Sequence, residues 1–84
     1  MKLKTKAITV KRVDNAWLMA ELGAKLQALR QARGLTLQQV ASALEVTRAS
    51  VNNWELGKAQ TGFLVERLYN IAIFYDVPVT KLLP

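Results

Sequence analysis

Apolar side chains recur at helical spacing through most of the chain, in stretches that are separated by helix-capping and turn residues. The first stretch follows spacings of four and three residues, with its apolar positions at Leu18, Leu22, Leu26 and Leu29. This spacing predicts one buried face of a helix that ends near Arg33, where Gly34 can act as the C-terminal cap. Asp14 or Asn15 offers its N-cap. Gly23 weakens the middle of this helix by about 1 kcal/mol, so a break into two shorter helices is the alternative.

Two shorter helices are predicted next, with only three residues between them. Thr36 and Gln39 form a capping-box pattern, which opens a helix over Leu37–Leu44. Thr47 can cap the following helix, which runs from residue 48 to about residue 56 and stops at the next glycine. Two helices joined by so short a turn have the geometry of a helix-turn-helix. The alternative is a plain helical hairpin whose polar face is only solvated.

The side chains within residues 37–56 fit the geometry of a helix-turn-helix. Residues that must face the core or the other helix are apolar, namely Val40, Leu44, Val46, Val51 and Trp54. Ala41 is small where the two helices approach most closely. Four side chains of the second helix then point away from the core, namely Arg48, Ala49, Asn52 and Asn53. Both tryptophans, Trp17 and Trp54, are expected in the core.

The last part of the chain predicts a fourth helix and a final turn. The helical apolar stripe consists of Leu64, Leu68, Ile71, Ala72 and Tyr75. Pro78 blocks its continuation, and residues 79–83 fit one more turn that packs Leu82 and Leu83 on the core. The pattern as a whole predicts an all-α fold, a compact bundle of five short helices in a single domain over residues 14–84.

The amino-terminal segment, residues 1–13, differs from the rest in pattern and in charge. Its β-branched residues, Thr5, Ile8, Thr9, Val10 and Val13, favour an extended segment or a short strand. Residues 1–12 carry five basic and no acidic side chains, whereas residues 13–84 carry seven basic and six acidic ones. The segment is therefore a solvated basic tail, a basic arm along nucleic-acid phosphates, or a strand at residues 6–13 that pairs with its copy in a homodimer. The alternation of Ile8 and Val10 favours the strand.

The amino-acid composition argues against most enzymatic functions. The chain has 84 residues, 51% of them hydrophobic, which is one small folded domain. Because it has no cysteine and no histidine, it lacks a thiolate nucleophile, the commonest general base and the commonest metal ligand. No histidine can activate Ser42 or Ser50, and the six acids show no metal-ligand pattern. We expect a non-enzyme without cofactor or metal, and, in the absence of a long apolar run, a cytoplasmic protein without a membrane segment.

The residues from Leu22 to Leu83 resemble the Cro/phage-repressor type of helix-turn-helix domain, also called the xenobiotic-response-element or lambda-repressor-like type. The matching text is LRQARGLTLQQVASALEVTRASVNNWELGK at Leu29–Lys58, followed by a helix and a VPVTKLL ending. The resemblance implies a five-helix domain that binds operator DNA as a homodimer, with the second helix of the motif in the major groove.

Two positions depart from the pattern of that family. The family often has a phosphate-contacting Gln at the start of the motif's first helix, where this chain has Leu37. It commonly has Gly in the turn, where this chain has Glu45. Because a left-handed conformation at a residue other than glycine costs about 1–2 kcal/mol, the turn is either strained or slightly different in backbone.

Side chains on the exposed face of the second helix suit contacts with bases. Arg48 can bond guanine O6 and N7 with its two-pronged guanidinium, and the amides of Asn52 and Asn53 match adenine N6 and N7. Ala49 and the methyl group of Thr47 can touch a thymine methyl group.

Other residues are expected to contact the phosphate backbone or to hold the helices in place. Phosphate contacts are expected near the two helix N-termini from Thr36, Gln38 and Ser50. The family resemblance adds Lys58 and Gln60 as backbone-gripping positions. It also implies a largely buried ion pair between Arg30 and Glu55, which sets the angle of the motif against the first helix.

These observations predict a sequence-specific DNA-binding transcriptional regulator, a homodimeric repressor of the phage or mobile-element type with double-stranded operator DNA as its partner. One alternative is the antitoxin of a toxin–antitoxin pair, which represses its own operon and binds a toxin with another surface. A second alternative is a protein-interaction module whose basic arm docks on an acidic protein. Only the two DNA-binding interpretations predict a steep salt dependence and a base-sequence preference.

Overall fold

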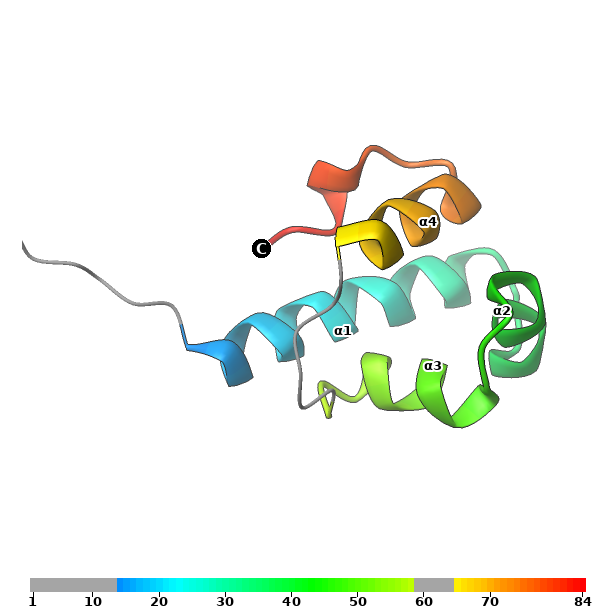
Figure 1. The fold of residues 1–84 in the computed structure, drawn as a ribbon, viewed down its shortest axis with the longest axis horizontal. Helices are drawn as coiled ribbons and strands as arrows, with labels where there is room; N and C mark the ends of the chain where they lie inside the picture. Colours follow the sequence, from blue (N-terminus) through cyan, green and yellow to red (C-terminus); the bar gives the residue numbers. More distant parts are fainter. Residues whose placement is uncertain (1–13, 59–64) are drawn as a thin grey trace, which may run out of the picture.

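The computed structural model describes residues 14–58 and 65–84, and the elements in them are helical. They are α1 (Asn15–Ala32), α2 (Leu37–Leu44), α3 (Arg48–Glu55), α4 (Val65–Tyr75) and the short 3-10 turn η2 (Val79–Lys81). Helix α1 runs through the middle of the molecule, with α4 on one side and α3 on the other (Figure 1). Helix α2 packs on both α3 and α4. The strand expected at residues 6–13 lies outside the described residues.

The all-α prediction is confirmed, but the expected five helices are four α-helices and one 3-10 turn in the described ranges. Pro78 lacks an N–H and precedes a segment that closes only i→i+3 hydrogen bonds, from Lys81 N to Pro78 O at 2.9 Å and from Leu82 N to Val79 O at 3.0 Å. Leu82 is fully buried, whereas Leu83 is 46% exposed, contrary to the expectation. Neighbouring residues of a single turn point in different directions, so only one of the two reaches the core.

Helix α1 is continuous through Gly23, so the alternative of two shorter helices is wrong. Asp14 Oδ1 accepts a hydrogen bond from Ala16 N at 3.0 Å, and Gly34 follows the last turn with φ 63°. A Cβ atom on Gly23 would lie 2.5 Å from the carbonyl oxygen of Trp54. The glycine therefore marks the place where the backbones of α1 and α3 meet, not a helix break.

The turn between α2 and α3 adopts the strained alternative. Glu45 has φ 57° and ψ 43°, which is the left-handed region that favours glycine. The hydrogen bond from Val46 N to Ala41 O, at 3.0 Å, closes the end of α2 and holds this conformation. At the other end of α2 the capping box of Thr36 and Gln39 is present with both of its hydrogen bonds.

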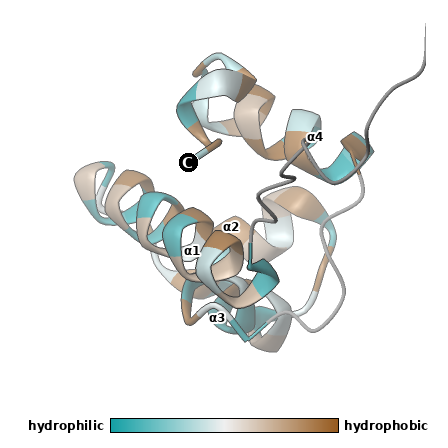
Figure 2. Cartoon of the chain, turned by 90° about the vertical axis from the view of Figure 1, so that its left-hand side faces the viewer, coloured by the Kyte–Doolittle hydropathy of each residue, from teal (hydrophilic) through white to brown (hydrophobic). Residues whose placement is uncertain are grey.

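The core lies between the helices and takes residues from all of them. Each helix has a hydrophobic and a hydrophilic side, visible as brown and teal sectors in Figure 2. The buried apolar residues are Met19, Leu22, Leu26, Val40, Ala41, Val51, Trp54, Ile71, Ala72, Tyr75 and Leu82. Trp17, expected in the core, is instead 49% exposed. It precedes Leu18, about 100° away around α1, and so falls outside the stripe that faces the other helices.

Candidate nucleic-acid interface

Helix α3 divides into a buried and an exposed side. Val51, Trp54 and Glu55 are buried against the rest of the molecule. The recognition face, which we define as the side chains of Arg48, Ala49, Asn52 and Asn53, is exposed. The structure thus brings these four of the five residues expected to contact bases onto one accessible surface, about one and a half helical turns long.

Thr47 caps the N-terminus of α3, and its hydroxyl group contacts the hydroxyl group of Ser50. Thr47 Oγ1 accepts a hydrogen bond from Ser50 N at 3.1 Å, and the two hydroxyl oxygens, Thr47 Oγ1 and Ser50 Oγ, are 2.8 Å apart. Thr47 is exposed and Ser50 is half-buried. An incoming phosphate would therefore meet two hydroxyl groups that are already oriented by each other.

The N-terminus of α2 presents two more of the expected phosphate ligands. Thr36 Oγ1 accepts from Gln39 N within the capping box, which leaves the hydroxyl hydrogen of Thr36 available as a donor. Gln38 Nε2 donates to Ser42 Oγ at 3.1 Å and keeps its second N–H. Leu37, at the position where the family often has Gln, is half-buried and packs against the core.

A bidentate ion pair joins α1 to the end of α3. Arg30 Nε lies 2.7 Å from Glu55 Oε2, and the terminal nitrogen Nη2 lies 2.9 Å from Oε1. Arg30 Nη1 also donates to the carbonyl oxygen of Leu35 at 3.0 Å. The side chains of Arg30 and Glu55 are only 14% and 3% exposed. Hydrogen bonding to Glu55 raises the pKa of Arg30, while burial acts in the opposite direction.

Two expected backbone-gripping residues follow α3. Lys58 is exposed, and its backbone N–H donates to the carbonyl oxygen of Asn53 at 2.9 Å, so its position is tied to α3. Gln60 lies outside the described residues.

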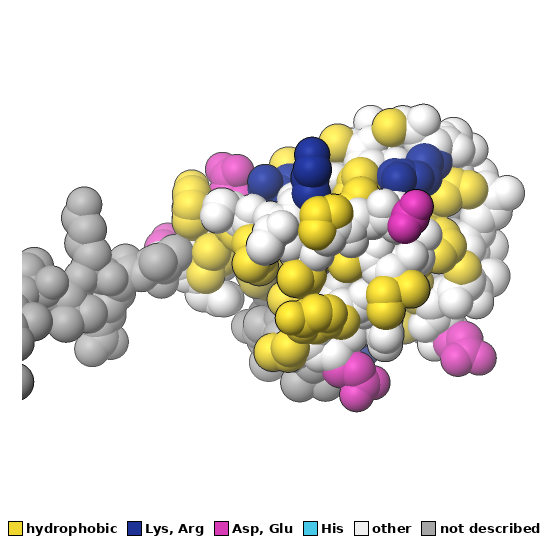
Figure 3. Space-filling model, turned by 90° about the horizontal axis from the view of Figure 1, so that it is seen from above, with side chains coloured by type: hydrophobic (Ala, Val, Ile, Leu, Met, Phe, Trp, Pro, Cys, Tyr) yellow, Lys and Arg dark blue, Asp and Glu magenta, His cyan; other side chains and the backbone are white. Residues whose placement is uncertain are grey.

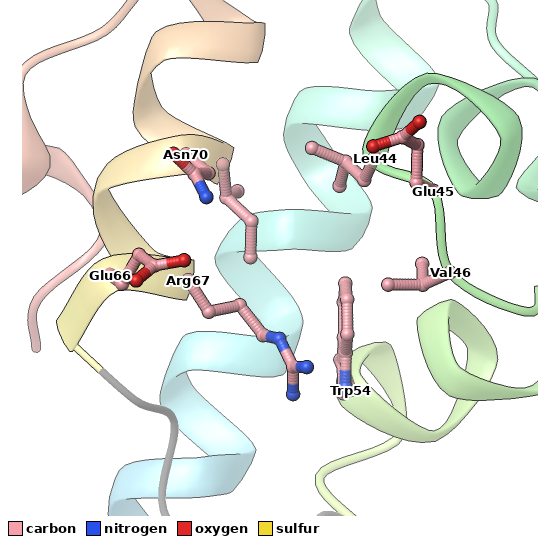
Figure 4. A pocket seen from close by; sticks show the side chains of 8 residues that line it. Leu44, Glu45, Val46, Trp54, Glu66, Arg67 and Asn70 are labelled. Atoms are coloured by element: carbon pink, nitrogen blue, oxygen red, sulfur yellow. The ribbon is translucent and has the colours of Figure 1, made fainter.

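A cleft of about 300 Å³ separates the α2–α3 turn from α4 and was not expected from the sequence. In Figure 4, Arg67 extends from α4 across this cleft toward Trp54 on α3. The guanidinium carbon of Arg67 lies 5.2 Å from the centre of the Trp54 ring. The sequence pattern places Arg67 only on the polar side of α4, because a helical periodicity says nothing about which other helix a long side chain reaches.

Among residues 14–58 and 65–84, no three His, Cys, Asp or Glu side chains come close enough to hold a metal ion. No helix within those ranges is long and apolar enough to cross a membrane.

Comparison with known proteins finds relatives for most of the chain. Residues 21–78 match the model of a family described as "Helix-turn-helix domain". The HTH-type transcriptional activator BcrR of Enterococcus faecalis is 38% identical over 63 residues, which are 75% of this chain and 30% of BcrR. The chain therefore matches less than one third of the length of that relative.

Solved structures show the same fold. The DNA-binding domain of BldD from S. venezulae superposes with a TM-score of 0.69 at 37% identity, covering 81% of this chain and 99% of that domain. The restriction-modification controller protein C.AhdI from Aeromonas hydrophila superposes with a TM-score of 0.68 at 23% identity, covering 76% of this chain and 94% of the controller.

Proposed function

Because the chain belongs to the Cro/phage-repressor type of helix-turn-helix DNA-binding domains, we propose that it is a homodimeric repressor of the phage or mobile-element type, which acts by occupying a specific operator. The observation that carries the proposal is the recognition face on α3. Its side chains are exposed, while the buried side of the same helix is held by α1 through the Arg30–Glu55 pair.

Base reading in this proposal comes from α3 in the major groove. An α-helix with its side chains is about 10–12 Å wide and fits a groove about 12 Å wide. Arg48 bonds a guanine with two donors, and Asn52 and Asn53 pair with adenines. Ala49 and the Thr47 methyl group contact thymine methyl groups.

Phosphate contacts orient the domain on the duplex. The hydroxyl groups of Thr36 and Ser50 and the amide of Gln38 lie near the N-termini of α2 and α3, whose unpaired N–H groups attract anions. Lys58, and Gln60 beyond the described residues, add backbone contacts at the end of α3. These contacts give affinity without sequence preference.

The exposed side of α4 supports the homodimer. An apolar stripe, which we define as Val65, Tyr69 and Ile73, is spaced four residues apart, and these side chains are 68%, 53% and 74% exposed. Figure 3 shows hydrophobic side chains gathered over the face formed by α4 and the C-terminal turn. A second copy of the chain can cover such a stripe, in addition to or instead of pairing through residues 6–13.

Selection of bound duplexes from a random DNA pool tests the proposal. We expect a preferred site made of two inverted half-sites with centres about 10 base pairs apart, bound by two chains. The variants Arg48→Ala and Asn53→Ala should each lose preference at one base pair in each half-site. A pool without enrichment would contradict sequence-specific binding, and a single half-site bound by one chain would contradict the homodimer.

Activation is the second candidate function, because BcrR is named a transcriptional activator. Transcription from a promoter that carries the selected site distinguishes the two. Repression by occupancy predicts lower transcription when the site overlaps the promoter and no effect when it lies upstream. Higher transcription from the upstream site would favour activation.

A further inference from the structure

Arg67 is held in an unusual way for a surface arginine. It is an exposed residue in the first turn of α4, yet its guanidinium lies over the ring of Trp54, which is buried in α3 and only 7% exposed. In residues 14–58 and 65–84 the ion pair is the one between Arg30 and Glu55. No carboxylate in those ranges therefore forms an ion pair with Arg67. The stack restricts a long cationic side chain while leaving its charge unpaired there.

The stacked guanidinium lies on a definite side of the recognition helix. At about 100° per residue, Trp54, Ser50 and Asn53 follow one another around one flank of α3, and Arg48 lies on the opposite flank. The ring of Trp54 faces α4 across the cleft (Figure 4). Arg67 therefore places a positive charge beside the Ser50 and Asn53 flank, where α3 itself has no charged side chain.

A helix in the major groove has a phosphate backbone on each side. A guanidinium that lies over an indole ring keeps N–H donors at its edge, which match the oxygens of a phosphodiester. We propose that Arg67, positioned by Trp54, binds a phosphate of the DNA strand that borders the Ser50 and Asn53 flank of α3. This inference rests on the proposed function and adds α4 to the DNA-binding surface.

Two carboxylates line the same cleft and limit where the phosphate lies. Figure 4 places Glu45 at the α2 end of the cleft, and the guanidinium of Arg67 at the opposite end beside Trp54. Glu66 precedes Arg67 on α4 and lines the same cleft. The phosphate therefore binds at the outer, Trp54 end of the cleft, and Glu66 weakens its binding by repulsion.

The salt dependence of DNA binding tests this assignment with the full chain. We expect Arg67→Gln to lower the slope of log K against log salt by about 0.9 and to weaken the selected and a random duplex by the same factor. Lys81→Gln is the matched control, because it removes one positive charge from the exposed η2 turn, which lies on the other side of α1 from α3. An unchanged slope for Arg67→Gln, or an equal loss for Lys81→Gln, would overturn the proposal.

Two further variants separate the charge from the stack. Arg67→Lys keeps the charge but has no planar group to stack on Trp54, so we expect the wild-type slope with weaker binding. Glu66→Gln should tighten binding to both duplexes. Wild-type affinity for Arg67→Lys would overturn the role of Trp54, and weaker binding for Glu66→Gln would overturn the position of the phosphate.

The same titrations distinguish failure of this inference from failure of the proposed function. A wild-type chain that binds no duplex overturns both. A wild-type chain that prefers its selected site, with a slope that Arg67→Gln does not change, overturns only the assignment of Arg67.

Discussion

Helix α3 is held very differently by α1 and by α4. Against α1 it forms backbone contact at Gly23 and a bidentate ion pair through Arg30 and Glu55. Against α4 it borders a cleft of about 300 Å³, which Arg67 crosses to reach Trp54. Helix α3 is thus fixed closely against α1, whereas α4 meets it across an open cleft through one long side chain, for which we propose a phosphate ligand.

The difference between the two contacts predicts which property a substitution at each of them changes. Close packing without free volume transmits any change in shape or charge to the whole domain. Substitutions of exposed side chains around an open cleft change the free energy of unfolding little, so we expect them to affect binding instead. We therefore expect substitutions at the α1–α3 contact to change stability, and substitutions on the exposed surfaces of α3 and α4 to change the proposed DNA binding.

Removing the carboxylate at the α1–α3 contact should have the largest effect. We expect Glu55→Ala to lower the free energy of unfolding by about 3–5 kcal/mol, because it leaves Arg30 charged, largely buried and unpaired. Urea denaturation measures this loss. Glu66→Ala, at an exposed carboxylate beside the cleft, is the control and should change stability by less than about 0.5 kcal/mol. A loss below about 1 kcal/mol for Glu55→Ala would contradict the asymmetry between the two contacts.

Adding one carbon at the helix crossing should be the next largest effect on stability. A Cβ at position 23 would lie 2.5 Å and 2.6 Å from the carbonyl oxygens of Trp54 and Glu55. We expect Gly23→Ala to destabilise by about 1–3 kcal/mol, although alanine is the better helix former by about 1 kcal/mol. Ala24→Gly, at an exposed position of the same helix, measures the difference in helix propensity between alanine and glycine without the close contact. Stabilisation by Gly23→Ala would show that the two backbones are not in close contact.

Truncation on the recognition face should weaken binding without loss of stability. We expect Arg48→Ala to reduce the free energy of binding to the preferred site by about 1–3 kcal/mol and to flatten the preference at one guanine. Fluorescence titration of the selected and a random duplex measures both quantities. Equal weakening of the two duplexes would make Arg48 a phosphate contact, not a base contact.

Relieving the strain in the α2–α3 turn should have the smallest effect. Glu45 has φ 57°, so Glu45→Gly removes a conformational strain of about 1–2 kcal/mol. Glycine also gains entropy in the unfolded chain, worth about 0.4–1 kcal/mol, so we expect a net stabilisation of about 0.5–1 kcal/mol. Asp76→Gly, at φ 54°, should behave alike. Destabilisation by both variants would mean that the two side chains contribute contacts that outweigh the strain.

The local elements were predictable from the sequence because their signals are local. The capping residues Thr36 and Thr47 set where α2 and α3 begin, and side-chain hydrogen bonds to backbone N–H groups three residues away need no tertiary contact. The spacing of apolar residues also predicted which side of α3 is buried, at Val51 and Trp54. The recognition face followed from these two facts together.

The contacts between elements were decided only by the tertiary structure. The low helix propensity of Gly23 fits a helix break and a close crossing of two helices equally well. Only the position of the Trp54 carbonyl oxygen shows that it marks a crossing. Trp17 and Leu83 are apolar, yet a chain this small has too little interior to bury every apolar side chain. Arg67 reaches Trp54 because the first turn of α4 faces α3 across the cleft, a placement that no pattern within residues 65–75 encodes.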